Sequence, residues 1–386
     1  VLMVAAAAID AELGAYPPET RGDRTLLASY ARLQRRNDPH KSSSNNLGYE
    51  LIDRYLRPMT TPERIGVLSE GWGTVAYTGA DQLPVSRRYM DGACWEILQF
   101  EFLEGRPFTV QEDAEGAPLA VINQATRDRL FGGLPALGRT IQTALGDFRV
   151  VGVVRNVSEA RTVFADVWLP LGTVSWPREG LPGMVNNLEV LLLARSPADL
   201  PKVKAEFQTR IAQVDLTGVA PYEELIAFAD TPFERLARSV HGYSSEETAA
   251  ATVRLVATLS LAALLFMLLP ALNLVNLNLS RILERGSEIG VRRSFGAPRR
   301  SLVWQLLVEN VVLTLAGGVL GGMLSVLVLH TFSWWGWAQF LEFHLSPRVF
   351  LCGLGVTLAF GLLSGAYPAW RMARLHPVAA LRGERR

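Results

Sequence analysis

A long apolar stretch of this chain runs from Leu255 to Ser280 and contains no Asp, Glu, Lys or Arg. A helix of that length crosses the ~30 Å hydrocarbon core of a bilayer. Arginines follow at once, with only two glutamates among them: Arg281, Arg285, Arg292, Arg293, Arg299 and Arg300. Because positive residues concentrate in cytoplasmic loops, the pattern predicts a membrane helix that ends in the cytoplasm.

Two further apolar runs follow the arginine-rich loop. Residues 301–329 are apolar apart from a few positions such as Glu309, and residues 349–370 carry no Asp, Glu, Lys or Arg. The loop at 330–348 is rich in Trp and poor in Lys and Arg, which is typical of the outer side of a membrane. The tail at 371–386 is rich in Arg, which favours the inner side. The predicted topology alternates consistently.

The first residues form a short apolar segment, Val1–Ile9. Nine apolar residues are too few to span a bilayer. We interpret residues 1–9 as the end of a truncated first transmembrane helix. A signal-peptide remnant is one alternative, although no basic region precedes these residues. A buried N-terminal segment is another alternative. The orientation above then places residues 10–250 outside the cytoplasm.

The region from 10 to 250 has the charged, turn-rich composition of a folded domain and a mixed pattern that predicts α+β structure. We expect a stalk helix and the second transmembrane helix in residues 251–280, and the arginine-rich loop in 281–300. The expected elements of the domain are a strand in 24–33, a helix in 49–56, a strand at 120–123, a helix at 124–131 closed by Gly132, a hairpin in 139–154 turning at Gly146-Asp147, a strand at 188–193, a helix in 198–214, and a helix from Glu223 onward.

Motifs that carry chemistry are absent from the sequence. It contains no GxxxxGK[ST], HExxH, CxxC or GxSxG, and its five His are scattered. Cys94 and Cys352 fall in different regions, which argues against a disulfide. The formal net charge of +1 gives no reason to expect a nucleic-acid partner. We therefore predict no catalytic residue, no metal site and no cofactor bound by this chain.

Glycines recur at helical spacing inside the predicted membrane helices. They form overlapping GxxxG patterns at Gly317, Gly318, Gly321 and Gly322, and a further one at Gly361 and Gly365. Small residues allow membrane helices to approach closely. The pattern predicts helix packing, either within the chain or at a dimer interface.

The arginine-rich loop has the composition of a short amphipathic helix. Glu288 and Arg292 form an i,i+4 pair in the favourable order, Gly296 can end the helix, and Pro298 can begin the next one. Apolar residues such as Ile289 remain in a segment that has left the bilayer. They require either a protein partner or the membrane surface.

Two sets of motifs resemble a known family. ERGSEIGVRRSFGAPRR (284–300), the following SLVWQLLVENVVLTLAGGVLGG, and AYPAWRMARLHPVAALRGE (366–384) resemble FtsX-like ABC transporter permeases. YMDGACWEILQFEFLEGRPFTVQED (89–113), PLAVINQATRDRLFGG and LGRTIQTALGDFRVVGVVRNV (137–157) are similar to the MacB-type periplasmic core domain.

The resemblance implies an α+β extracytoplasmic domain with porter-like and Sabre-like lobes, the smaller at about 92–155, joined to an α-helical transmembrane bundle. It implies a type VII permease of the bacterial inner membrane, working as a homodimer or a heterodimer with a related permease. ATP and Mg would bind to a partner ABC ATPase, and a periplasmic adaptor is a further possible partner.

The resemblance also implies that the arginine-rich helix docks on the ATPase. The expected coupling residues are Glu284, Arg285, Glu288, Ile289, Gly290, Val291, Arg292, Arg293, Phe295 and Gly296. The function implied is mechanotransmission, in which ATP hydrolysis on the partner moves the periplasmic domain for efflux or export. The alternative is an FtsX-type regulatory protein that controls a periplasmic partner such as a cell-wall hydrolase.

Overall fold

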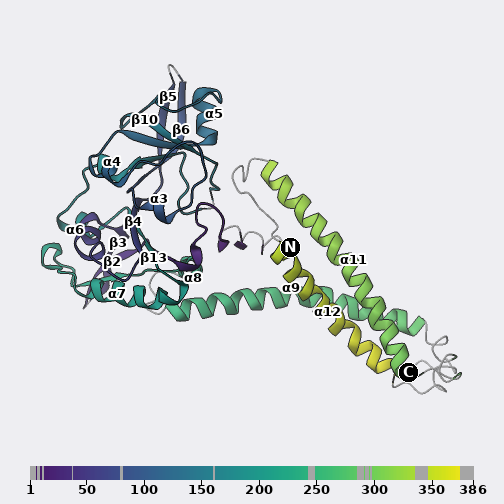
Figure 1. Cartoon of the computed structure of the whole chain (residues 1–386). Helices are drawn as coiled ribbons and strands as arrows, with labels where there is room; N and C mark the ends of the chain where they lie inside the picture. Colours follow the sequence, from purple (N-terminus) through teal and green to yellow (C-terminus); the bar gives the residue numbers. More distant parts are fainter. Residues whose placement is uncertain are drawn as a thin grey trace. The chain divides into compact units, whose positions relative to one another are not determined.

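A computed structural model of the protein describes residues 6, 9–10, 13–36, 38–78, 81–159, 161–241, 248–284, 291, 295, 298–334 and 347–373. The chain divides into two compact units. One comprises residues 12–252, and the other comprises residues 1–11 and 253–386. Figure 1 shows the strands gathered in the first unit and the long helices in the second.

The unit at 12–252 is α+β, which confirms the predicted fold class. Its strands are β1 (Thr25–Ala28), β2 (Ala31–Arg35), β3 (Asp38–Leu47), β4 (Arg64–Ser69), β5 (Trp72–Thr78), β6 (Asp81–Met90), β7 (Phe102–Gly105), β8 (Leu119–Asn123), β9 (Thr140–Thr143), β10 (Gly146–Val154), β11 (Val167–Pro170), β12 (Val185–Asn186), β13 (Leu188–Leu193) and β14 (Glu224–Ala227). Its α-helices are α2 (Tyr49–Leu51), α3 (Cys94–Ile97), α4 (Val110–Ala114), α5 (Gln124–Phe131), α6 (Gly180–Met184), α7 (Leu200–Ala212) and α8 (Pro232–His241). A π-helical turn, η2 (Ile52–Leu56), continues α2, and 3-10 turns lie at η1 (Gly22–Arg24), η3 (Leu171–Thr173), η4 (Pro197–Asp199) and η5 (Thr217–Val219).

Six of these strands close into a ring. β6 pairs with β5 and with β11, and the path continues through β9, β10 and β8 back to β11. The ring strands contribute residues to one buried apolar cluster, among them Val85, Ile141, Phe148 and Ile122. The ring begins before residue 92 and continues past residue 155, so it extends beyond the expected smaller lobe on both sides. Closing the ring satisfies strand edges that would otherwise be exposed.

Strand β7 pairs with β10 of the ring, and the remaining strands lie around β13. Strand β13 pairs with β1, β3 and β4, and every one of its residues is buried. The continuous apolar run that predicted a strand here reflects burial on both faces. Helix α7 contacts β14 and η2, and buries Val203, Phe207 and Ile211 from one of its faces. The predicted strand at 188–193 and the helix within 198–214 are confirmed.

Three local predictions need correction. Residues 24–33 form two strands rather than one, because the chain changes direction at Ser29 and Tyr30, after which β2 pairs with β3. The hairpin β9–β10 exists, but Gly146 pairs with Thr143, so the turn lies at residues 144–145. Thr143 Oγ1 accepts a hydrogen bond from the Leu145 amide at 3.1 Å, which stabilises the earlier turn.

The third correction concerns the helix predicted from Glu223 onward. Residues Glu224–Ala227 form strand β14, which pairs with β2, and the helix begins only at Pro232. Thr231 and Glu234 cap that start, since the Thr231 amide donates to Glu234 Oε2 at 2.8 Å and the Glu234 amide donates to Thr231 Oγ1 at 3.3 Å. Pro fits the first turn of a helix and disrupts its interior, which explains the late start.

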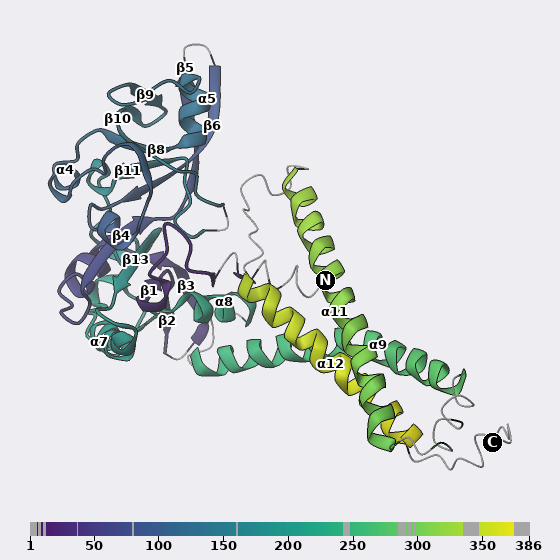
Figure 2. The same ribbon diagram turned by 45° about the vertical axis from the view of Figure 1, so that its right-hand side comes forward.

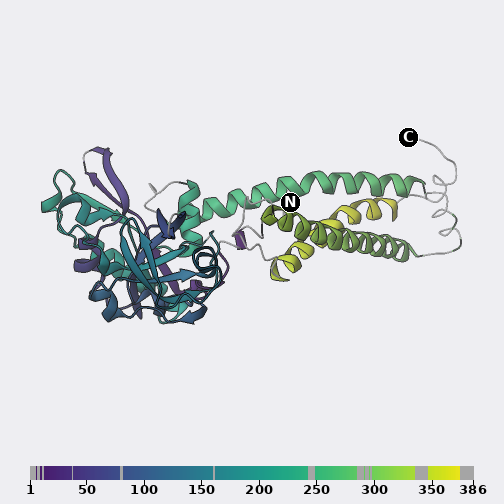
Figure 3. The ribbon, with the colours of Figure 1, turned by 90° about the horizontal axis from the view of Figure 1, so that it is seen from above.

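Helix α9 (Thr248–Glu284) begins at the end of the α+β unit and continues into the second unit, which also contains α11 (Arg299–Trp334) and α12 (Pro347–Ala373). Figures 2 and 3 show α12 beside α11. The segments Ala250–Leu277 and Leu307–Val328 are long and apolar enough to cross a membrane, and a shorter apolar segment lies at Phe350–Leu363. Helix α11 begins directly after Pro298, where the sequence predicted a helix start, and continues past 329 to Trp334.

Candidate coupling loop and helix interface

Three of the predicted coupling residues lie in the described part of the structure. Glu284 closes α9, while Val291 and Phe295 belong to one helical turn, in which the Phe295 amide donates to the Val291 carbonyl at 3.1 Å. The remaining coupling residues lie outside the described residues: Arg285, Glu288, Ile289, Gly290, Arg292, Arg293 and Gly296.

The turn presents apolar surface outward. Val291 is 47% exposed and Phe295 is 88% exposed, and their i,i+4 spacing puts both on one face. Burying a Phe side chain contributes on the order of 1.5–3 kcal/mol. A partner surface or a membrane surface that covered this face would therefore gain stabilisation.

The predicted packing glycines separate into two groups. A Cβ at Gly318 would lie 2.7 Å from Leu354 Cδ1, one at Gly322 would lie 2.5 Å from Phe350 Cε2, and one at Gly361 would lie 2.5 Å from Thr314 Oγ1. These three glycines therefore allow α11 and α12 to approach closely. Nothing described lies within 4 Å of a Cβ built at Gly317 or Gly321. Gly365 belongs to α12, but its surroundings lie outside the described part.

Asn310 contributes to the same interface and was missed from the sequence. It is buried in α11, and its Nδ2 donates to the Gly361 carbonyl of α12 at 2.9 Å. Because Gly361 has no side chain, the Asn310 side chain can reach the Gly361 carbonyl. An Asn in an otherwise apolar helix could have predicted this contact, since such side chains form hydrogen bonds between membrane helices.

The motif at 89–113 builds an aromatic cluster in the α+β unit. The Trp95 ring lies 5.0 Å from Phe100, 5.6 Å from Phe102 and 5.2 Å from Phe108, measured between ring centroids. A Cβ at Gly92 would lie 2.5 Å from Val110 Cα, so this position needs Gly for close backbone contact. The motif is therefore explained by packing.

Asp91, in the same motif, is a buried carboxyl. Burial raises its pKa from 3.8 to about 6, against the lowering effect of Arg57. Arg57 Nη2 lies 3.3 Å from Asp91 Oδ2, and the Cys94 amide donates to Asp91 Oδ1 at 3.2 Å. Asp91 therefore fastens α3 to the end of the π-helical turn η2.

Arg88 and Glu189 form a buried ion pair that the sequence did not predict. Arg88 Nη1 donates to Glu189 Oε2 at 3.0 Å and to the Ser69 carbonyl at 2.6 Å, and Arg88 Nε donates to the Phe164 carbonyl at 3.0 Å. Burial raises the pKa of Glu189, and the Arg88 charge opposes that rise. The pair joins β6 to β4, β13 and the loop before β11.

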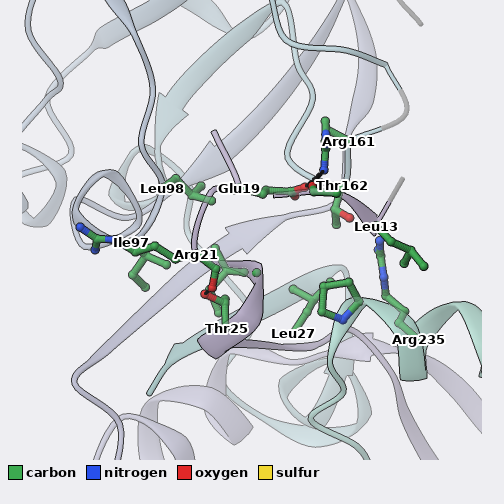
Figure 4. Close-up of a pocket in the computed structure, with 14 residues that line it drawn as sticks. Leu13, Glu19, Arg21, Thr25, Leu27, Ile97, Leu98, Arg161, Thr162 and Arg235 are labelled. Atoms are coloured by element: carbon green, nitrogen blue, oxygen red, sulfur yellow. Dashed lines mark hydrogen bonds and ion pairs between the residues drawn. The ribbon is translucent and has the colours of Figure 1, made fainter. Parts of the chain in front are cut away.

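A small pocket lies in the α+β unit where the chain enters and leaves it (Figure 4). The entering segment supplies Leu13, Glu19 and Arg21, and the start of α8 supplies Pro232 and Arg235. The remaining walls are mainly apolar and include Leu27, Ile97, Leu98 and Leu191. Within the described residues, no group of His, Cys, Asp or Glu has the arrangement of a metal site.

Comparison with known proteins identifies both parts of the chain. Residues 13–210 match the family of MacB-like periplasmic core domains, and residues 260–377 match the FtsX-like permease C-terminal family. These matches confirm the resemblance seen in the motifs.

Curated relatives have the same name across several bacteria. The chain is 27% identical over 286 residues to the macrolide export ATP-binding/permease protein MacB of Bdellovibrio bacteriovorus, covering 72% of this chain and 41% of that protein. It is 29% identical to the MacB of Sodalis glossinidius, covering 75% of this chain and 42% of the relative. The chain thus spans less than half the length of these relatives.

Solved structures also match the chain. The periplasmic region of MacB from Actinobacillus actinomycetemcomitans aligns with a TM-score of 0.38 at 10% identity, covering 56% of this chain and 94% of that one. The extracellular domain of the ABC-type transporter YknZ aligns with a TM-score of 0.38 at 14% identity, covering 52% of this chain and 99% of that one. With a MacB-like periplasmic core domain over half of its length and an FtsX-like permease domain after it, the chain belongs to the MacB-like family of ABC transporter permeases.

Proposed function

We propose that this chain is the permease part of an ABC transporter of the bacterial inner membrane that works by mechanotransmission. ATP hydrolysis on a partner ATPase would move the loop at 284–296, and the membrane helices would transmit that movement to the periplasmic domain. Dimerisation with a second permease and contact with a periplasmic adaptor belong to the same proposal.

The exposure of Phe295 is the observation that carries the proposal. An aromatic side chain 88% exposed, one turn from the exposed Val291, stands in an arginine-rich stretch between two candidate membrane spans. Apolar anchors surrounded by charge are typical of the centre of a protein interface, where burial supplies affinity and charge supplies orientation. The family membership supports an ATPase as the partner.

The coupling role can be tested in a complex captured with its ATPase. Purification of the tagged chain from detergent-solubilised membranes should yield the ATPase, and Phe295→Asp should weaken that association by about tenfold or more, because it buries a charge at the interface centre. Leu134→Asp is a matched control, since Leu134 is also exposed but lies in the periplasmic domain. Unchanged association and unchanged ATP turnover in Phe295→Asp would assign the loop to the membrane surface instead.

The topology is proposed from the arginine distribution and is tested by labelling. In a background lacking Cys94 and Cys352, Ser44→Cys should react with an impermeant maleimide in intact spheroplasts, because Ser44 is exposed in the domain proposed to be periplasmic. Val291→Cys should react only after permeabilisation. The reverse pattern would overturn the assignment.

The regulatory alternative differs in what the periplasmic domain contacts. If the purified complex contains a cell-wall hydrolase whose activity depends on ATP, the chain is a regulator rather than an export permease. Co-purification of a periplasmic adaptor, with ATP-dependent export, supports transport.

A further inference from the structure

The segment that enters the α+β unit is held by one buried arginine. Arg161 is only 6% exposed, and its Nη1 donates to the Gly14 carbonyl at 2.8 Å and lies 3.4 Å from Glu19 Oε2. Its guanidinium also lies 5.3 Å from the centroid of the Tyr16 ring. Figure 4 shows Arg161 and Glu19 meeting at the pocket. Three points of one segment are thus bound by a single side chain.

Arg161 belongs to the loop before β11, and hydrogen bonds connect this loop to the buried strands of the α+β unit. The Phe164 amide donates to the Arg161 carbonyl at 3.1 Å, which fixes a turn, and Trp168 Nε1 donates to the Val163 carbonyl at 3.1 Å. The Phe164 carbonyl accepts a bond from Arg88, whose guanidinium reaches Glu189 in β13. Hydrogen bonds and ion pairs therefore connect the entering segment to the middle of the sheet.

The segment that leaves the unit also lines this pocket, through Pro232 and Arg235. Asp230 and Leu27 exchange two backbone hydrogen bonds, of 2.9 and 3.0 Å, which tie the start of α8 to β1. Arg238 lies 2.7 Å from Asp230 Oδ2 and is fully buried, and Lys204 pairs with Glu234. The entering and leaving segments are thus held by separate sets of contacts, and both segments line the pocket.

We propose that Arg161 is a positioning residue for force transmission, through which displacement of the entering segment reaches the centre of the periplasmic domain. The proposal rests on the proposed function, because it assumes that the segment is displaced when ATP is hydrolysed. A guanidinium suits this role, since its planar fork can bond a carbonyl and a carboxylate while stacking near a ring. The pocket beside it, which residues of both segments line, supplies unfilled space next to Arg161.

Hydrogen exchange of the full chain in detergent tests the fastening without ATP. In Arg161→Ala, amides of residues 13–21 should exchange faster by on the order of tenfold, because the bonds that hold the segment are lost. Arg161→Lys should give a smaller increase, since an ammonium keeps the charge and loses the planar contact with Tyr16. Arg155→Ala is the control, because Arg155 pairs with Glu101 at an exposed site. Unchanged exchange at 13–21 in Arg161→Ala would overturn the proposal.

The same variants test transmission in the chain reconstituted with its ATPase. Between the nucleotide-free and ATP-trapped states, the wild type should show a change in exchange at the loop 161–164 and in β13. Arg161→Ala should lose that change while keeping basal ATP hydrolysis. Tyr16→Leu, which removes the ring from the other partner, should reproduce the loss if Arg161→Ala fails to fold.

The outcomes separate the two proposals. If exchange at 13–21 rises in Arg161→Ala but the ATP-dependent change persists, Arg161 only packs the segment and the transmission role is wrong. If the wild type shows no ATP-dependent change, mechanotransmission itself fails, and exchange at 13–21 still decides whether Arg161 holds the segment.

Discussion

The helix pair α11–α12 and the α+β unit are stabilised by different forces, although both depend on glycines and on buried polar groups. In the α+β unit, apolar side chains fill two buried clusters, and the buried Arg88 and Glu189 form an ion pair. In the candidate spans, large apolar side chains such as Leu269 and Leu363 point outward. In a membrane, lipid would replace water around these helices, and burial would then supply little drive between them.

The comparison teaches that one residue type serves two purposes. Gly92 and Gly152 bring backbone segments together inside the α+β unit, where a Cβ would meet backbone atoms. Gly322 and Gly361 bring two helices together, where a Cβ would meet a neighbouring side chain. A buried polar group likewise joins strands in one unit, at Glu189, and helices in the other, at Asn310.

The largest effect is expected in the α+β unit. Glu189→Ala should lower the free energy of unfolding by ~3–5 kcal/mol, because it leaves the buried Arg88 charge without its carboxylate. Denaturant unfolding of the full chain in detergent, followed by amide exchange in β13, measures it. The exposed pair gives the control, since Arg155→Ala should cost far less because solvent screens the Arg155–Glu101 pair. A double variant, Arg88→Met with Glu189→Leu, should recover most of the loss; equal costs for the buried and exposed pairs would refute the assignment.

A pH-dependent effect should follow from Asp91. Its folded pKa of about 6 exceeds the ordinary 3.8, so its contribution to stability is fully present below pH ~3.8 and is lost as the pH rises through 6. The shift corresponds to about 3 kcal/mol between these limits. Subtracting the unfolding curve of Asp91→Asn from that of the wild type isolates this term from other carboxyls. A flat difference between pH 4 and 7 would show that Asp91 keeps its ordinary pKa.

A smaller loss of stability is expected from a substitution in the α11–α12 interface. Gly322→Leu should destabilise the α11–α12 pair by ~1–3 kcal/mol, because the new side chain must displace Phe350. Thermal unfolding in detergent measures this. Gly321→Leu is the matched control, since nothing described lies within 4 Å of a Cβ built at that position. If Gly321→Leu instead changes the oligomer size by light scattering, that face contacts a second copy.

The smallest effect is expected at Asn310. Asn310→Leu removes the hydrogen bond to the Gly361 carbonyl, and bonds between membrane helices contribute about 0.6 kcal/mol on average, with a maximum of about 1.7. The same thermal assay applies. Ser325→Ala is the control, because Ser325 donates to Gly321 within its own helix. A larger loss for Ser325→Ala would indicate that Asn310 does not hold the two helices together.

The sequence predicted helices and strands correctly where residues close in sequence determine their start and end. Helix α5 begins after Asn123, whose side chain accepts from the Thr126 amide, and ends at Gly132 with a φ of +63°. Both signals are local, so the predicted bounds of 124–131 were correct. The prediction of a helix from Glu223 failed, because pairing of β14 with β2 outweighed the apolar spacing.

The glycine spacing indicated that helices pack closely, but it did not indicate which glycines face the neighbouring helix. Glycine spacing predicted close helix packing, yet it could not say that Gly318 and Gly322 face α12 while Gly317 and Gly321 do not. Rotation about the axis of a helix is set by its neighbour, which a single helix pattern does not contain.

By itself, the sequence determined where the chain is apolar enough to enter a membrane, where positive charge concentrates, and which short segments begin and end as helices or strands. These properties depend on residues within a few positions of each other. Only the tertiary structure decided that six strands close into a ring, that Asn310 bonds to α12, and that Arg88 meets Glu189. The last two partners are 101 positions apart, and their contact depends on the whole arrangement of β4, β6 and β13, because a buried charge is tolerated only where the fold brings its counter-charge beside it.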